Sequence, residues 1–143
     1  MLLRESMYTR YTSGQFGVIM NFGQAIGSGF RNYIGFGGRA CRSEFWYWVL
    51  FANLVSLGTV ILDRVLFPEN TLGPLAALFA LAVLLPGLAV SFRRLHDIDK
   101  SGWWILISLA PIIGWVILIV WAIKKGDETT NRFGSNPLAS GTT

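Results

Sequence analysis

The sequence predicts an all-α integral membrane protein with three transmembrane helices, preceded by a short amphipathic helix in the membrane interface. Three observations lead to this fold class. Hydrophobic residues make up 52% of the 143-residue chain and charged residues only 14%, against a usual charged share of roughly 25%. The apolar residues form three long blocks that contain no Asp, Glu, Lys or Arg. None of these blocks alternates with the period of two that is typical of a barrel strand.

The three predicted spans cover residues 45–62, 72–92 and 103–123. At about 1.5 Å per residue they make helices of roughly 27 to 32 Å, close to the ~30 Å thickness of the hydrocarbon core. The buried core of a soluble helical protein is the alternative interpretation. It is disfavoured because so short a chain has too few polar residues to cover three such blocks.

A short helix is expected over residues 21–34, with Asn21 as its N-cap. Five apolar residues of this segment fall near one helical face: Phe22, Ile26, Phe30, Tyr33 and Ile34. This stripe favours an amphipathic helix that lies in the membrane interface. An irregular amphipathic lead-in stays open, because three glycines within the segment weaken a helix.

The length predicts one membrane domain, over residues 20–137. Residues 1–19 are expected to be a mobile extension and residues 138–143 a disordered tail. Organised sequence begins at Asn21, so Met20 is a candidate for the true start. A single Cys excludes an internal disulfide framework and a Cys-based zinc cage, and a single His excludes a multi-histidine metal site. No cofactor or metal is therefore expected.

Three spans would place the N-terminus and residues 93–102 on one side of the membrane and residues 63–71 and the C-terminal tail on the other. The first side carries six Arg and Lys residues near the span ends, and the second carries four. This excess weakly favours an N-terminus in the cytoplasm, although Lys124 and Lys125 argue against it. Because the cations flank apolar blocks, anionic lipid rather than nucleic acid is the expected partner of this chain of net charge +4.

Two polar segments on the predicted cytoplasmic side contain the residue types of a binding site, residues 38–46 and 92–104. Their arginines can grip phosphate or carboxylate as bidentate donors, and the nearby carboxylates would orient them. The candidate binding cluster consists of Arg39, Arg42, Glu44, Arg93, Arg94, His96 and Asp97. A purely structural role stays open, in which the arginines set topology while His96 and Asp97 cap helices or pair with arginines.

A second candidate site lies inside the membrane, where the spans contain no Asp, Glu, Lys, Arg or His. This absence argues against a proton-coupled transporter. Asn53, Pro86 and Pro111 all fall roughly 9 to 12 Å deep from the same face. Each proline frees the carbonyl four residues earlier, on Ala82 and Ile107, so the three residues could form a small polar niche. Alternatively, Asn53 joins helices and the prolines only bend them.

Three ordered motifs add a resemblance: residues 36–46 (FGGRACRSEFW), 93–104 (RRLHDIDKSGWW) and 131–137 (NRFGSNP). Together they resemble the family named domain of unknown function 805, whose members are small bacterial inner-membrane proteins. The resemblance covers about residues 20 to 138. Cys41 stands where members often carry Arg, and residues 1–19 have no counterpart. The resemblance implies a location in the bacterial cytoplasmic membrane, but it supplies no established activity and no catalytic residues.

The expected function is therefore that of a non-enzymatic, multi-pass protein of the bacterial inner membrane. It would bind lipid headgroups or a protein partner through the candidate cluster, alone or as a homo-oligomer. An oligomeric pore or small-solute transporter is the alternative. A lipid-modifying enzyme with His96 and Asp97 as acid and base is disfavoured, because the chain has one His and no metal-ligand set. No catalytic residue is assigned.

Overall fold

The computed structural model describes residues 19–139, and within this range the chain is helical with no strand. The elements are α2 (Phe22–Arg31), α3 (Arg42–Leu66), α4 (Pro74–His96), the 3-10 helix η1 (Gly102–Leu109) and α5 (Ile113–Ile123). Two helices of the described range, α3 and α4, are long and apolar enough to cross a membrane. The extension expected up to residue 18 and the disordered tail expected from residue 140 lie outside the described residues.

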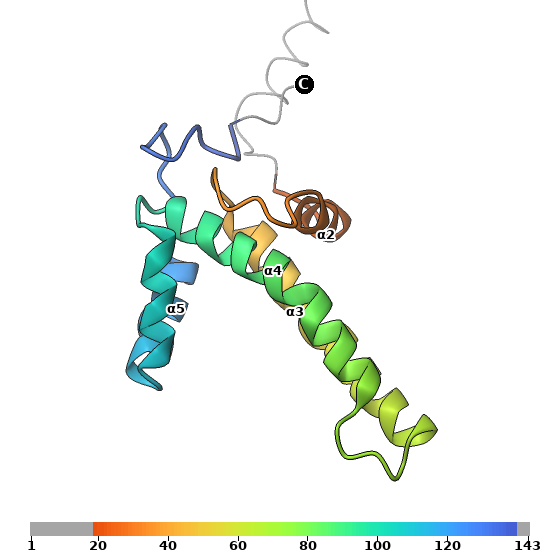
Figure 1. Cartoon of the computed structure of the whole chain (residues 1–143). Coiled ribbons are helices and arrows are strands. Elements are labelled where there is room, and N and C mark those ends of the chain that lie inside the picture. The colour runs from red at the N-terminus through yellow and green to blue at the C-terminus, as the bar shows by residue number, and fades with distance from the viewer. Residues whose placement is uncertain (1–18, 140–143) are drawn as a thin grey trace, which may run out of the picture.

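The helices form two hairpins that share one end of the molecule (Figure 1). The long hairpin consists of α3 and α4, and the short one of η1 and α5. From their shared end the two hairpins diverge like the arms of an inverted V, with α2 lying across the long hairpin near the top. Residues 124–139 fold over the same end. We call this end, with α2, the loops 32–41 and 97–101 and residues 124–139, the polar end.

The apolar block over residues 103–123 is not one continuous helix, so the single helix predicted across it does not form. The chain runs down through η1, turns at residues 110–112 and returns through α5. Two hydrogen bonds fix the return: Arg94 Nε donates to the Ala122 carbonyl at 3.2 Å, and the Asp127 amide donates to the Asp97 carbonyl at 2.8 Å. Each arm is only about 16 Å long, roughly half the hydrocarbon thickness.

Proline and glycine near the middle of this block explain the turn. Ile112 has φ 67° and ψ −68°, and the Ile113 amide donates to the Pro111 carbonyl at 2.9 Å, which closes a tight γ-turn. A Cβ on Gly114 would lie 1.7 Å from the Ile107 carbonyl oxygen. Only glycine therefore allows the two arms to approach so closely. The Ile107 carbonyl, expected to be freed by Pro111, accepts from the Ala110 amide at 3.0 Å.

A helix forms where one was expected, with Asn21 as its N-cap, but α2 ends at Arg31 rather than at residue 34. The Asn21 side chain accepts from the Gln24 amide at 2.9 Å, and the Gln24 side chain accepts from the Asn21 amide at 3.0 Å. This reciprocal pair is a capping box. Two residues of the expected stripe contact α3: Phe22 packs edge-on against Tyr47 and Phe30 against Trp48, with ring centroids 5.7 and 5.2 Å apart. Tyr33 and Ile34 lie beyond the end of the helix, and Ile34 is exposed. A Cβ on Gly29 would lie 2.3 Å from the Trp48 ring, so a glycine that weakens the helix lets it pack closely on α3.

The far end of the long hairpin is fastened by a buried carboxylate. Helix α3 runs to Leu66, beyond the predicted span end at residue 62, and this extension includes Asp63. The Asp63 side chain accepts from the amides of Leu75 at 3.0 Å and Ala76 at 2.8 Å. These are among the first N–H groups of α4, which have no acceptor within their own helix. The last turn of α3 thus caps the first turn of α4.

Replacing Asp63 by Ala should lower the free energy of unfolding by about 1–2 kcal/mol, because two partly buried amides at the start of α4 lose their acceptor. Equilibrium unfolding of the purified protein in detergent, followed by circular dichroism, measures this change. Glu69→Ala is the matched control, since it removes an exposed carboxylate from the same connection. Equal unfolding curves for the two variants would show that the Asp63 cap contributes nothing.

Candidate binding site at the polar end

All seven residues of the predicted binding cluster lie at the polar end. Arg39 lies in the loop before α3, Arg42 and Glu44 in the first turn of α3, and the remaining four at the end of α4. Arg42 is exposed, whereas the other six are buried. Five of the six buried residues form ion pairs: Glu44 pairs with Arg93, and Asp97 pairs with both Arg39 and Arg94. We refer to these as the Glu44 group and the Asp97 group.

The Glu44 group joins three helices through one carboxylate oxygen. Glu44 Oε1 of α3 accepts from Arg93 Nη1 of α4 at 2.7 Å and from Ser28 Oγ of α2 at 2.8 Å. Arg93 Nε and Nη2 are buried and have no hydrogen-bond partner within the described chain. A buried donor without an acceptor costs about 1–3 kcal/mol. The pair therefore positions α2 on the long hairpin at an energetic cost that the surrounding packing has to offset.

The Asp97 group places one carboxylate between two guanidinium groups. Asp97 Oδ1 accepts from Arg39 Nε at 3.0 Å, and Oδ2 accepts from Arg94 Nη1 at 2.6 Å. Burial raises the pKa of Asp97 above its ordinary value, and the charges of Arg94 and Arg39 oppose that rise. Desolvation therefore outweighs the ion pairs at this carboxylate, which is common for buried pairs.

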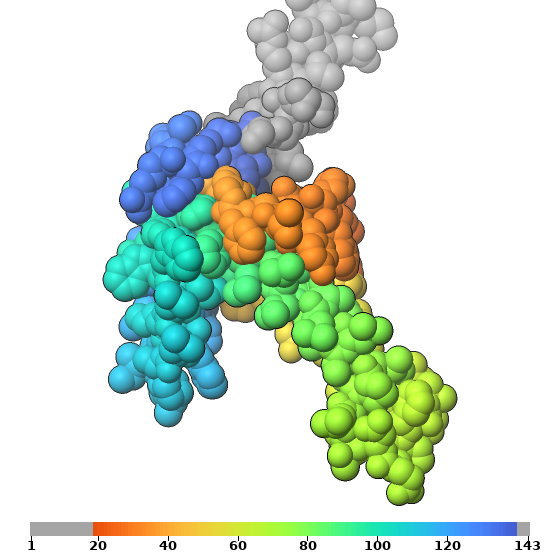
Figure 2. Space-filling view, viewed as in Figure 1, coloured from red at the N-terminus to blue at the C-terminus, as the bar shows by residue number. Residues whose placement is uncertain are grey.

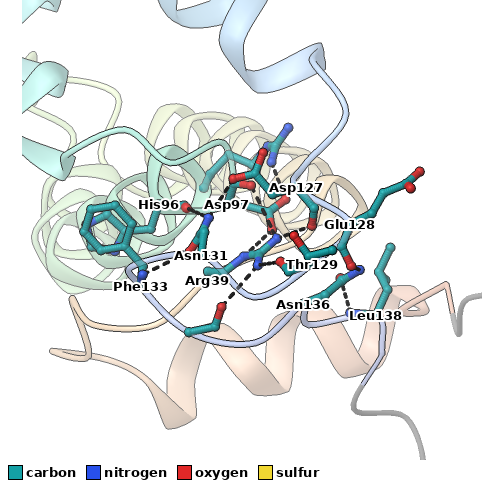
Figure 3. A network of polar contacts seen from close by, with 12 residues as sticks. Arg39, His96, Asp97, Asp127, Glu128, Thr129, Asn131, Phe133, Asn136 and Leu138 are labelled. Carbon is teal, nitrogen blue, oxygen red and sulfur yellow. Dashed lines mark hydrogen bonds and ion pairs between the residues drawn. The ribbon is translucent and has the colours of Figure 1, made fainter.

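Arg39 connects this carboxylate to the C-terminal tail (Figure 3). Its Nη1 donates to the carbonyls of Thr129 at 2.7 Å and Gly134 at 3.2 Å, and its Nη2 donates to the carbonyl of Asp127. Every guanidinium nitrogen of Arg39 thus has a protein acceptor. Arg39 fixes the tail over the polar end, and Asp97 fixes Arg39.

Arg94 performs the equivalent task for the short hairpin. Its Nε donates to the carbonyl of Ala122 at 3.2 Å, and its Nη2 to those of Trp121 at 3.4 Å and Lys124. These carbonyls belong to the last turn of α5, where a cation also interacts favourably with the helix dipole. Arg94 caps α5 and holds its C-terminal end beside α4. Its nitrogens, like those of Arg39, are occupied by the protein itself.

His96 packs against the tail. Its ring stacks on Phe133 with centroids 3.8 Å apart and an interplanar angle of 4° (Figure 3), and its Nδ1 lies 2.9 Å from the Gly38 carbonyl oxygen. Since a carbonyl oxygen only accepts, this contact favours the tautomer with the proton on Nδ1. The His96 carbonyl accepts from the Asn131 side chain at 2.9 Å. In the described chain, Asp97 binds arginines rather than the His96 ring.

The residues of the predicted intramembrane niche lie in different surroundings. Asn53 is exposed, and its side chain donates to the Val49 carbonyl of its own helix at 2.8 Å. Pro86 is buried in α4, whereas Pro111 is exposed at the tip of the short hairpin. The Ala82 carbonyl, which lies four residues before Pro86, accepts from the Tyr33 hydroxyl. The carbonyl that Pro86 was expected to free thus fastens the segment after α2.

Two residues of the site carry no signal that the sequence pattern could reveal. Ser28 is a small polar residue in a glycine-rich helix, and only the fold brings it to Glu44. Gly126 lies in the turn-rich tail, where a Cβ would meet Asp97 Oδ2 at 2.0 Å. The close approach of the tail to the Asp97 carboxylate therefore requires a glycine at this position.

A family model described as "Protein of unknown function (DUF805)" matches residues 33–135. The chain is 42% identical over 109 residues to the inner membrane protein YhaH of Escherichia coli strain K12, covering 75% of this chain and 90% of the relative. It is 41% identical over 107 residues to the inner membrane protein YhaI of the same strain, covering 75% and 89%. Both names support a bacterial inner-membrane location for this chain. No solved structure matches the chain.

Asp97→Asn should lower the free energy of unfolding by about 3–5 kcal/mol, because two buried guanidinium groups lose their counter-charge. It should also speed cleavage by trypsin after Arg132, since the tail loses its anchor. Asp99→Asn is the control: its pair with Arg132 is half exposed and contributes only about 0–1 kcal/mol. Unfolding in detergent and limited proteolysis measure both effects. If the two variants behave alike, Asp97 does not organise the polar end.

Proposed function

The chain belongs to the DUF805 family, and from this premise we propose that it is a non-enzymatic, multi-pass inner-membrane protein whose polar end faces the cytoplasm and binds anionic lipid headgroups. The observation that carries the proposal is the return of α5 to the polar end. Because α5 returns, residues 124–139 lie on the same side of the membrane as α2 rather than on the opposite side. The positive charges of this tail therefore share a side with those of the polar end.

The dimensions of the helices support two full crossings and one half crossing. Helices α3 and α4, of 25 and 23 residues, are roughly 37 and 34 Å long, enough for a core of about 30 Å. The short hairpin enters to about the middle and returns. At its tip the amides of residues 113, 114 and 116 donate to the carbonyls of residues 111, 110 and 112. A tip with its backbone groups paired in this way can lie in hydrocarbon.

The positive charges then fall almost entirely on one side. Nine of the ten Arg and Lys residues within 19–139 belong to the polar end, and only Arg64 lies at the other end of the long hairpin. In a three-span topology, Lys124 and Lys125 would oppose a cytoplasmic N-terminus. In the re-entrant topology they favour it, so the positive-inside rule supports a cytoplasmic polar end far more strongly.

Exposed cations, rather than the buried arginines, are the groups available to lipid. Arg39 and Arg94 already donate to protein acceptors, which assigns them a structural role. The exposed cations at the polar end are Arg31, Arg42, Lys124, Lys125 and Arg132. Each such residue near an anionic leaflet contributes about 1 kcal/mol of attraction. Helix α2, with Phe22 and Phe30 partly exposed, fits an amphipathic helix at the headgroup level.

Cysteine labelling tests the topology. In a Cys41→Ala background, Glu69→Cys should react with a membrane-impermeant maleimide in cells whose inner membrane is intact, whereas Glu128→Cys should react only after that membrane is permeabilised. Both positions are exposed, so accessibility depends on the side of the membrane alone. Three full spans would place both positions on the same side. Equal labelling of the two would therefore exclude the re-entrant hairpin.

Neutralising exposed cations tests headgroup binding. Glutamine at Arg31, Lys125 and Arg132 should weaken the preference for phosphatidylglycerol over phosphatidylcholine roughly fivefold per removed charge. The lipid retained by the purified protein, quantified by mass spectrometry, measures this preference. Arg64→Gln is the control at the opposite end and should leave it unchanged. A triple variant with the lipid preference of the wild type would contradict the proposal. Release of a trapped ion from liposomes that contain the wild-type protein would also contradict it and would favour a pore.

A further inference from the structure

A cavity of about 130 Å³ lies where the two hairpins meet. All four of their helices contribute to its wall, through Phe45, Ser91, Arg94, Leu95, Ile105, Leu118 and Ala122. We call this place the fork. Its volume is close to that of an apolar protein cavity that holds benzene, about 150 Å³. The cavity can therefore hold a few carbon atoms of a hydrocarbon chain rather than a whole lipid. Below the fork the two hairpins diverge (Figures 1 and 2).

The two polar side chains in the wall are already engaged. Ser91 Oγ donates to the Gly87 carbonyl of its own helix at 2.8 Å. Arg94 donates through all three nitrogens to Asp97 and to the carbonyls at the end of α5. The rest of the wall is apolar, and the fork holds no spare donor for a phosphate. What enters the cavity must therefore be hydrocarbon.

Two exposed cations lie near the polar side of this cavity, which we call its rim, although neither is one of its wall residues. Arg42 precedes the wall residue Phe45 by about one helical turn, and its Nη1 lies 3.5 Å from the Ile123 carbonyl oxygen at the end of α5. Lys124 follows directly and is also exposed. Neither cation forms an ion pair with another residue of the range 19–139. An apolar cavity thus lies close to two cations that form no ion pair within the described chain, although Arg42 also lines a smaller pocket that contains the carboxylates of Asp97, Asp127 and Glu128.

We propose that the fork is a binding site for one anionic phospholipid. An acyl chain enters between the diverging hairpins and fills the cavity, while the phosphate lies against Arg42 and Lys124, where a guanidinium can bind it through two N–H groups. This inference rests on the proposed function and narrows general headgroup attraction to one site. It requires both chemistries in one molecule, since the cavity binds no phosphate and the rim binds no hydrocarbon.

The test is native mass spectrometry of the full chain released from vesicles of phosphatidylglycerol. The wild type should retain one tightly bound lipid. Leu118→Trp fills the cavity, and the double variant Arg42→Gln, Lys124→Gln removes the rim charges. Each of these two proteins should bind the lipid about tenfold or more weakly than the wild type. Val120→Trp, which adds the same bulk to an exposed position of α5, should retain it. Circular dichroism confirms folding, and Ser91→Leu replaces Leu118→Trp if the latter misfolds.

Three outcomes would contradict the proposed lipid-binding site. Equal retention by the Leu118→Trp and Val120→Trp proteins would show that the cavity holds no chain. Equal binding of glycerophosphoglycerol, which has the headgroup but no acyl chains, would reduce the site to a surface for free phosphate. A second copy of the chain in place of the lipid would make the fork a dimer interface. In the first two cases the headgroup preference of the wild type would survive, whereas a wild type without that preference would overturn the proposed function itself.

Discussion

The fold at the polar end depends on the carboxylate of Asp97. It holds Arg39, which binds three carbonyls of the tail, and Arg94, which binds three carbonyls at the end of α5. Asp97 thus lies between the two arginines as their shared counter-charge. Buried ion pairs add little net stability because desolvation is expensive, but they select one arrangement over others. Here the arrangement selected is the return of the short hairpin and the position of the tail.

The local parts of this fold were predictable, and the topology of its last third was not. The Asn21 cap of α2 could be predicted because Asn21 and its partner Gln24 lie three residues apart. The donor to the freed Ala82 carbonyl could not, because Tyr33 lies 49 residues away. A 21-residue apolar block, however, satisfies the length rule whether it crosses once or turns back halfway. What decides is the pair Pro111 and Gly114, together with Arg94, whose acceptors lie 27 to 30 residues away.

For the candidate site, the sequence predicted which residues gather but not what each of them contacts. The residue types of the cluster were visible in two short segments, and the structure does gather them. Which of them serve the protein and which face outward depends on contacts across 58 to 95 residues, such as those of Arg39 with Asp97 and Gly134. A sequence pattern cannot assign those contacts. The consequence is that Arg42, one cation among four in that cluster, is the only one exposed at the surface.

A buried network that fixes the fork also fixes the distance between the rim cations and the cavity beneath them. The proposed lipid site would therefore link ligand binding to folding at this end, since a lipid that binds only the assembled fork would stabilise it by an amount that grows with the ratio of lipid concentration to dissociation constant. Within a bilayer that ratio is set by the composition of the leaflet. On this proposal, a membrane rich in anionic lipid would help to hold the short hairpin against the long one. A membrane poor in it would leave that contact to the protein's own interactions, such as those of Arg94 with the end of α5 and of Phe92 with Trp103.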